Sequence, residues 1–182
     1  MRGLGKTYRD TPESTGYFKR LPAGGYVIKI TEVENKDDKD YLNITFDIAE
    51  GEHKGFYSDE WGKEHKFAHT FVRSYKETAL RMFKGFLKAV DDSNGTNFVE
   101  KAEKGFPEQQ LVGKGVGILL GYEEYVNYRG EIRERSRVAA TRSVDAIRSG
   151  DYKVPELKKI VPAADVPATA PEGFTADDEL PF

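Results

Sequence analysis

Residues 41–48 alternate between apolar and polar side chains, and this alternation constrains the fold more than any other feature of the chain. The apolar series is Leu42, Ile44, Phe46 and Ile48. The polar series is Tyr41, Asn43, Thr45 and Asp47. A period of two is that of a β-strand with one face in a core and the other toward solvent or a ligand. The sequence therefore predicts a half-buried strand and a sheet that packs on one face.

Further strands are predicted on both sides of this one. A turn cluster at residues 21–25 introduces a strand at 26–31. Apolar residues alternate again at 116–120, and a turn joins them to a strand at 132–141. The 18 glycines and 10 tyrosines of the chain also favour β structure over a helical bundle.

One helix is predicted between the two groups of strands. Apolar residues recur there at helical spacing, at Leu80, Phe83, Leu87 and Val90. Residues 74–77 (SYKE) fit a capping box that would begin the helix, and residues 91–95 (DDSNG) would end it. A second short helix at 97–104 and one helical turn at 143–150 are weaker expectations.

This order of elements predicts a mainly β protein, an OB-fold-like five-stranded Greek-key barrel with one central helix between the third and fourth strands. Other small barrels fit the same pattern. We expect residues 1–20 to form a loose N-terminal arm, residues 21–160 the domain, and residues 161–182, which are rich in alanine and proline, a disordered acidic tail.

Charge is distributed unevenly between the body of the chain and this tail. The chain has 28 Lys and Arg against 31 Asp and Glu, a formal net charge of -3. Five of the acids and none of the bases lie after residue 160, so the body carries 28 bases against 26 acids. A body this mildly basic does not by itself indicate DNA binding, and any such surface must come from local clustering of cations.

The C-terminal tip has the composition of a peptide ligand. Its six residues are Asp177, Asp178, Glu179, Leu180, Pro181 and Phe182. A terminal phenylalanine ring can fill an apolar pocket, its α-carboxylate can pair with a cation, and the acids can steer the approach. The alternative is a solubilising acidic end, which would not need the phenylalanine.

This tip closely resembles the C-terminal tip of bacterial and phage single-stranded DNA (ssDNA)-binding proteins. The resemblance implies that the six residues bind replication, repair and recombination enzymes. Within residues 21–55, the segments LPAGGYVIKITEVE and YLNITFDIAEGEHKG resemble proteins from the replication modules of phages and prophages of Gram-positive bacteria. The opening strand typical of the housekeeping bacterial protein is absent, so its tetramer is not implied, and a homo-oligomer of another kind remains open.

The predicted C-terminal hairpin offers the best ssDNA-binding surface. A single strand needs cations for its phosphates and flat side chains on which its bases stack. Alternation places three arginines on one face of the last strand, and tyrosines accompany them across the hairpin. We expect binding by Arg129, Arg133, Arg135, Arg137, Tyr125 and Tyr128, with Tyr122 and Arg142 nearby. The alternative is a solvated face that is balanced by Glu131 and Glu134.

A second candidate segment, residues 56–73, interleaves aromatic and basic residues without clear periodicity. We expect ssDNA contacts from Trp61, Tyr57, Lys63, Lys66 and Arg73. Phe67 and Phe71 fit the core at least as well as a binding loop. Tyr41 and Lys29 are weaker candidates on the first two strands.

Other chemistry has little support in the sequence. The chain has no cysteine, which excludes disulfides and thiolate zinc sites. His65 and His69 have the spacing of a helical metal pair, but no third ligand is evident. We expect no metal, no cofactor, no catalysis and no membrane span, and a protein of the bacterial cytoplasm, with a phage or prophage as one source of the gene. Two alternatives to an ssDNA-binding protein remain: an adaptor of a phage replication module, and a metal-dependent nuclease.

Overall fold

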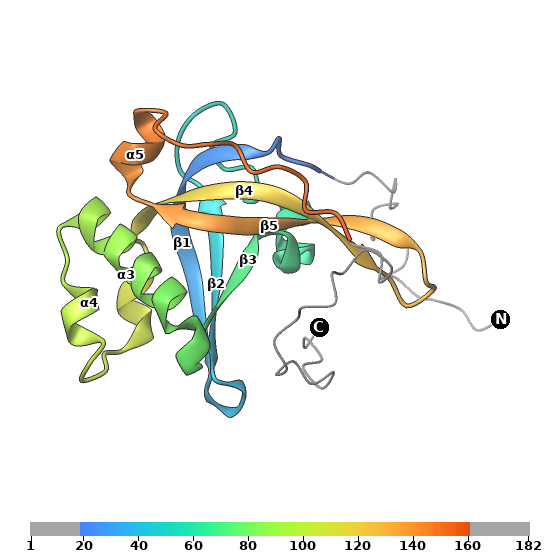
Figure 1. The fold of residues 1–182 in the computed structure, drawn as a ribbon. Helices are drawn as coiled ribbons and strands as arrows, with labels where there is room; N and C mark the ends of the chain where they lie inside the picture. Colours follow the sequence, from blue (N-terminus) through green and yellow to red (C-terminus); the bar gives the residue numbers. More distant parts are fainter. Residues whose placement is uncertain (1–18, 161–182) are drawn as a thin grey trace, which may run out of the picture.

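The computed structural model describes residues 19–160, which form a five-stranded antiparallel sheet with three of the helices gathered at one end (Figure 1). The strands are β1 (Gly24–Lys36), β2 (Tyr41–Ile48), β3 (Thr70–Ser74), β4 (Gly115–Val126) and β5 (Ile132–Arg142). The helices are α2 (Glu60–Glu64), α3 (Leu80–Asn94), α4 (Phe98–Lys101) and α5 (Val144–Arg148). Short 3-10 segments are η1 (Asp37–Lys39), η2 (Lys66–His69), η3 (Glu77–Ala79) and η4 (Glu108–Leu111). The fold is mainly β, as the sequence predicted.

The strand order in the sheet is β3-β2-β1-β4-β5. The long first strand is shared: Ile28 pairs with Ile48 of β2 on one side and with Val116 of β4 on the other. The two edge strands do not pair with each other among the residues described. Their neighbourhoods meet where the Ser136 hydroxyl of β5 donates to the Ala68 carbonyl of η2, at 3.4 Å. The sheet is therefore open, but curled enough for its two edges to approach.

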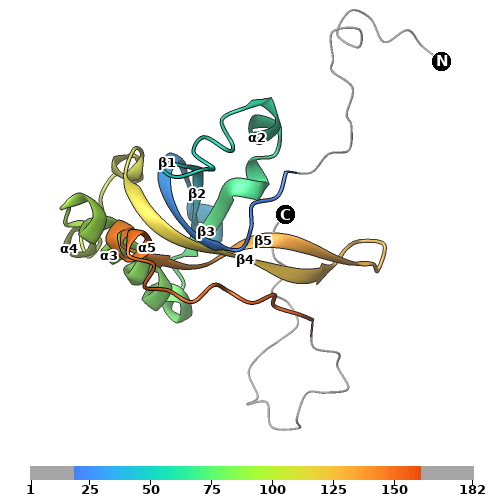
Figure 2. The same ribbon diagram turned by 90° about the horizontal axis from the view of Figure 1, so that it is seen from above.

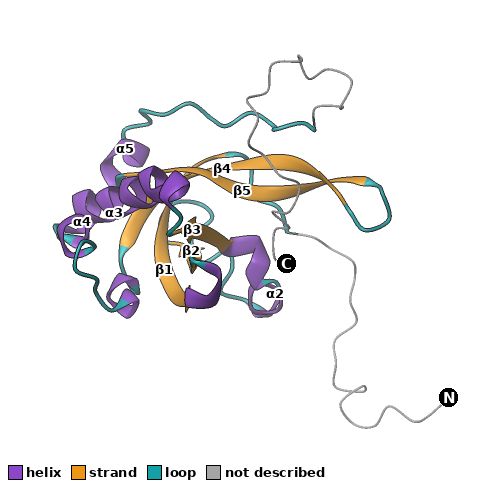
Figure 3. Cartoon of the chain, turned by 60° about the horizontal axis from the view of Figure 1, so that its bottom comes forward, coloured by secondary structure: helices purple, strands orange, loops and turns teal. Residues whose placement is uncertain are grey.

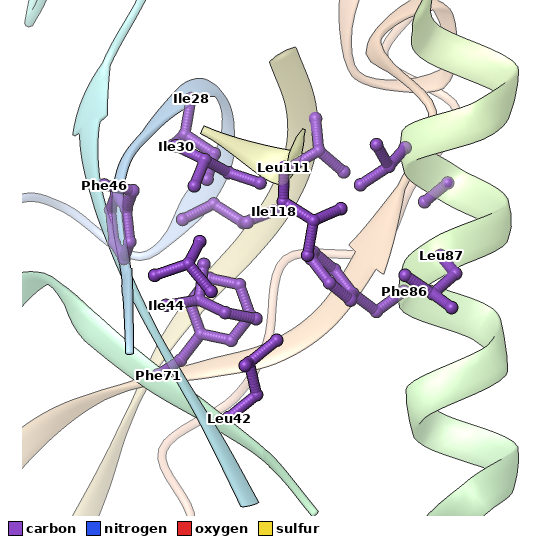
Figure 4. Packing of buried hydrophobic residues seen from close by; sticks show 14 of the residues in the cluster. Ile28, Ile30, Leu42, Ile44, Phe46, Phe71, Phe86, Leu87, Leu111 and Ile118 are labelled. Atoms are coloured by element: carbon purple, nitrogen blue, oxygen red, sulfur yellow. The ribbon is translucent and has the colours of Figure 1, made fainter. Parts of the chain in front are cut away.

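The core lies between the curled sheet and α3 (Figure 4). The apolar series of β2 is at most 3% exposed, which confirms the inward face predicted from its alternation. Phe86 and Leu87 of α3 pack against this layer, together with Ile118 of β4. Each such side chain contributes about 1.5–3 kcal/mol by its removal from water, so this layer is the main source of stability.

A smaller apolar cluster lies on the opposite face of the sheet. Val144 and Ile147 of α5 pack there against Val27 and Leu119. A Cβ on Gly117 would lie 2.4 Å from Cγ1 of Ile147, so only a glycine lets α5 pack this closely. The strand face outside the core is therefore partly covered at the end that carries the helices.

The start of the central helix differs from the prediction. Ser74 ends β3, and its hydroxyl accepts from the Lys76 N–H at 3.1 Å, so the predicted capping box does not form. The helix begins at Leu80, after η3, and ends at Asn94, where Gly95 adopts a φ of +63°. A glycine favours this left-handed conformation, and the predicted end of the helix is confirmed within a few residues.

The second short helix owes its position to Asp91 on α3. Its carboxylate accepts hydrogen bonds from the Thr96 hydroxyl (2.7 Å) and from the N–H groups of Phe98 (2.7 Å) and Val99 (2.9 Å), which begin α4. Partial burial raises the pKa of Asp91, but these hydrogen bonds outweigh it and hold the pKa below its usual value. The carboxylate therefore stays ionised and fixes α4 to the end of α3.

The prediction included a third strand before the central helix but did not locate it, and it missed α2. Both β3 and α2 lie in the segment without clear periodicity. Figure 3 shows α2 apart from the other helices. The Asp59 carboxylate caps α2 by accepting from the Gly62 N–H at 3.0 Å. A Cβ on Gly62 would lie 1.9 Å from the Tyr57 carbonyl oxygen, so glycine is required at this contact. None of the helices within residues 19–160 is long and apolar enough to cross a membrane.

Candidate nucleic-acid interface

The hairpin of β4 and β5 projects from the sheet at the end away from α3, α4 and α5 (Figures 1 and 2). Its register pairs Tyr125 with Arg133, Glu123 with Arg135 and Gly121 with Arg137, with no shift along this stretch. Alternate residues of a strand share a face, so the three arginines lie on the same side as Tyr125 and Glu123. We call this surface the hairpin face and define it by Glu123, Tyr125, Glu131, Arg133, Arg135, Arg137 and, as described below, Lys158.

Cations outnumber carboxylates on the hairpin face. Glu123 is shared by three of them: Arg135 at 2.8 Å, and Arg137 and Lys158 at 4.0 Å each. Arg133 pairs with Glu131 at 2.9 Å. Four cations against two carboxylates give the surface a net charge of +2. Arg133, Arg135 and Lys158 are 46–68% exposed, so their ion pairs contribute little to stability and the three cations are accessible to an anionic ligand. Glu123 is 18% and Arg137 32% exposed, so the Arg137 guanidinium is less accessible.

Glu131 remains ionised because of its neighbours. The Asn127 side-chain amide and the Arg133 guanidinium hold the pKa of its carboxyl below the usual value. The same Asn127 side chain accepts from the N–H groups of Arg129 and Glu131, both at 2.9 Å, and so fixes the turn. These hydrogen bonds therefore hold the turn of the hairpin in one conformation.

Two tyrosines accompany the cations. The Arg135 guanidinium lies 5.3 Å from the centre of the Tyr125 ring. At the turn, Tyr128 is 89% exposed, with the Arg129 guanidinium 5.2 Å from its ring centre. An aromatic ring this exposed can stack a nucleic-acid base, and the cations beside it can bind the adjacent phosphates.

The opposite side of the hairpin has a different character. The Tyr122 ring is buried there, its hydroxyl donates to the Leu21 carbonyl, and the Arg20 guanidinium covers it at 3.8 Å. Glu134 pairs with Arg20 at 2.6 Å. Tyr122 is therefore absent from the hairpin face, and Glu134 does not balance its arginines.

Two residues of the second predicted group are buried, and we correct their assignment. Tyr57 is 6% exposed and stacks on the His69 ring at 4.5 Å, and its burial raises its pKa. Arg73 is 4% exposed and lies against the rings of Phe71 (4.6 Å) and Phe86 (5.7 Å). Burial lowers the pKa of Arg73 to about 10, and its Nε has no hydrogen-bond partner in the part of the chain that the structure describes. Neither side chain can lie on an exposed binding surface.

The other members of that group lie apart from the hairpin face. Trp61 is half-buried and stacks on the His65 ring at 4.5 Å. Lys63 pairs with Glu60 at 2.6 Å and Lys66 with Glu32 at 2.7 Å. With three acids and two bases, residues 59–66 carry no net positive charge. Trp61, Lys63 and Lys66 therefore do not extend the cationic surface.

The sequence analysis left one residue open and missed another. Phe67 of η2, which fitted the core at least as well as a binding loop, is 68% exposed. Lys158 reaches Glu123 from a segment 35 positions later in the chain. No local pattern reveals such a contact, since it depends on how the chain returns after α5.

His65 and His69, which have the spacing of a helical metal pair, contact backbone carbonyl oxygens. His69 is buried, and its two ring nitrogens lie 2.5 Å from the Phe46 carbonyl oxygen and 3.0 Å from that of Gly62. Nδ1 of His65 lies 2.8 Å from the Trp61 carbonyl oxygen. Within residues 19–160, no group of three or more acidic or histidine side chains could hold a metal ion.

No model of a known protein family matches the chain, and no curated protein matches it significantly. A function therefore has to follow from the residues themselves and from their geometry.

Proposed function

We propose that this chain is an ssDNA-binding protein that coats and protects single strands during DNA replication or recombination, without catalysis. The hairpin face is the observation that carries the proposal. It combines a net charge of +2 with the ring of Tyr125, and the exposed Tyr128 lies at the turn of the same projecting two-stranded ribbon. Cations of this kind bind phosphates, and tyrosine rings stack bases of any sequence.

We also infer that the open sheet is an OB-type barrel, opened between β3 and β5. Three features support this: β1 is shared by β2 and β4, the central helix α3 follows β3, and a hairpin follows the helix. OB folds bind oligonucleotides with the face of their second and third strands and with the loops that follow the first and the fourth strands. In this chain the loop after the fourth strand carries Tyr128 and Arg129, and this loop is the part of the OB site that the proposed interface shares.

The predicted tip, residues 177–182, lies outside the described residues. We propose that it recruits replication and recombination proteins, as its resemblance implies. The last described residue, Ile160, donates its N–H to the Glu124 carboxylate of β4 at 3.0 Å. Residue 160, from which the chain continues toward the tip, therefore lies beside the hairpin.

Fluorescence anisotropy with labelled oligo-dT and a matched duplex, over a salt series, tests this function. We expect tight binding of the single strand, weak binding of the duplex, and an affinity that falls with salt as phosphate contacts are lost. A chain that ends before Asp177 should bind the single strand more tightly at low salt, because the acids of the removed tip no longer compete with phosphates for the cations. No binding by either version would refute ssDNA binding and favour the adaptor, and metal-dependent cleavage of the oligonucleotide would favour the nuclease.

A further inference from the structure

After α5, residues 155–160 return along β4 (Figures 1 and 2). The Lys158 N–H donates to the Tyr122 carbonyl at 3.0 Å, and its carbonyl accepts from the Glu124 N–H at 2.9 Å. The result is a parallel bridge between Glu123 and Lys158. β1 pairs with β4 no further than Leu120. Residues 155–160 therefore occupy the edge of β4 that β1 leaves open.

This segment is held by few contacts. Pro155 packs on Gly121, where a Cβ would lie 2.8 Å from Cβ of the proline. Leu157 lines an open cavity of about 510 Å³ with Arg20 and Tyr122, and remains 37% exposed. Besides the bridge, the Ile160 N–H donates to the Glu124 carboxylate at 3.0 Å. A segment with so few hydrogen bonds, little buried apolar surface and exposed side chains lies at the low end of local stability. Its release would break none of the pairings within the five-stranded sheet.

Docking of the segment changes the charge of the hairpin face. Without Lys158, three arginines face two carboxylates, a net charge of +1; with it, the net charge is +2. Nζ of Lys158 lies 4.0 Å from the same Glu123 carboxylate that pairs with Arg135 and Arg137. The docked segment thus places the Lys158 ammonium group at the centre of the hairpin face.

We propose that residues 155–160 are a detachable edge strand of the ssDNA site, with Lys158 as a phosphate-binding residue. This inference rests on the proposed function. Since the docked segment strengthens ssDNA binding, bound ssDNA must stabilise the docked segment by the same factor. The ligand is the sugar-phosphate backbone of a single strand.

Two variants test the proposal with oligo-dT as the probe. Lys158→Ala removes the cation, and Gly121→Ala displaces Pro155 while every charge is kept. Each should weaken dT binding about two- to fivefold, the range of one exposed ion pair. Lys158→Ala should also reduce the slope of log K against log salt by about 0.7, the value for one phosphate contact with a single strand.

Matched controls separate this effect from a general loss of charge or stability. Lys159→Ala makes the same charge change one residue later, where strand alternation places the side chain on the opposite face, and it should bind dT like wild type. Gly121→Ala combined with Pro155→Gly removes the clash and should restore affinity. In the full chain, saturating dT should slow hydrogen exchange at the Lys158 amide.

The outcomes distinguish the inference from the function on which it rests. If wild type binds dT while Lys158→Ala and Gly121→Ala bind equally well, residues 155–160 are not part of the site, and the proposed function stands. Unchanged exchange at the Lys158 amide on dT binding would overturn the coupling. Absence of dT binding by wild type would overturn the proposed function and this inference with it.

Discussion

Replacement of Tyr128 by alanine separates ssDNA binding from folding. The side chain is 89% exposed at the hairpin turn, and its described ring contact is with Arg129. We therefore expect Tyr128→Ala to change the free energy of unfolding by less than about 0.5 kcal/mol. If the ring stacks a base, its loss should cost about 1–3 kcal/mol of binding, which raises the Kd for oligo-dT about 5-fold to about 150-fold.

The natural control for this variant is Phe67→Ala. Phe67 is another exposed aromatic residue, 68% exposed on η2, but it lies outside the hairpin face. Anisotropy titration with dT should show a Kd within twofold of wild type for Phe67→Ala, and Tyr128→Phe should retain most of the affinity. The reasoning is refuted if Tyr128→Ala binds as tightly as wild type, or if Phe67→Ala loses as much affinity.

Three further predictions concern stability, measured by chemical denaturation. Gly62→Ala should lower the free energy of unfolding by more than about 2 kcal/mol, because its Cβ would lie 1.9 Å from the Tyr57 carbonyl oxygen. The control Gly85→Ala, on an open face of α3, should raise the free energy of unfolding by about 0.5–1 kcal/mol. Equal effects of the two substitutions would contradict the close approach of Gly62 to Tyr57. Arg73→Met should raise the free energy of unfolding by about 1 kcal/mol, because it removes a buried guanidinium that pairs with no carboxylate among residues 19–160. A lower free energy of unfolding would show that the ring contacts of Arg73 outweigh the cost of its burial. Asp91→Ala should cost about 0.5–2 kcal/mol at pH 7, as for a helix cap. Because the folded pKa of Asp91 lies below its unfolded value, that cost should be full above the unfolded pKa and shrink as the pH falls through the folded one; a cost that did not change with pH would contradict the assignment.

The sequence predicted the elements whose side chains repeat regularly. The alternation in β2 gave both the strand and its buried face, since Leu42, Ile44 and Phe46 are at most 1% exposed. The alternation of Arg133, Arg135 and Arg137 likewise predicted a shared face, because the register of the hairpin does not shift between Gly121 and Val126 and strand periodicity is kept there. Local periodicity sufficed where the local structure was regular.

The sequence predictions were wrong or incomplete where the position of a residue depends on packing against distant parts of the chain. Arg73 and Tyr57 have residue types common on DNA-binding surfaces, yet the aromatic core encloses both. β3 is short, and its identity follows from pairing with β2, which the sequence of β3 alone does not encode. Lys158 joins the hairpin face only because the chain returns along β4. Contacts of this kind depend on the tertiary fold.

The most direct test of the hairpin face compares two triple variants that remove equal charge. One is Arg133→Gln with Arg135→Gln and Arg137→Gln, and the other is Arg81→Gln with Lys84→Gln and Lys88→Gln on the exposed side of α3. The measurement is the slope of log K against log salt for oligo-dT. The hairpin variant should lose about 2 units of slope, at about 0.7 per phosphate contact, and most of its affinity, while the α3 variant keeps the wild-type slope. Equal losses in the two variants, or a wild-type slope in the hairpin variant, would contradict ssDNA binding through this face.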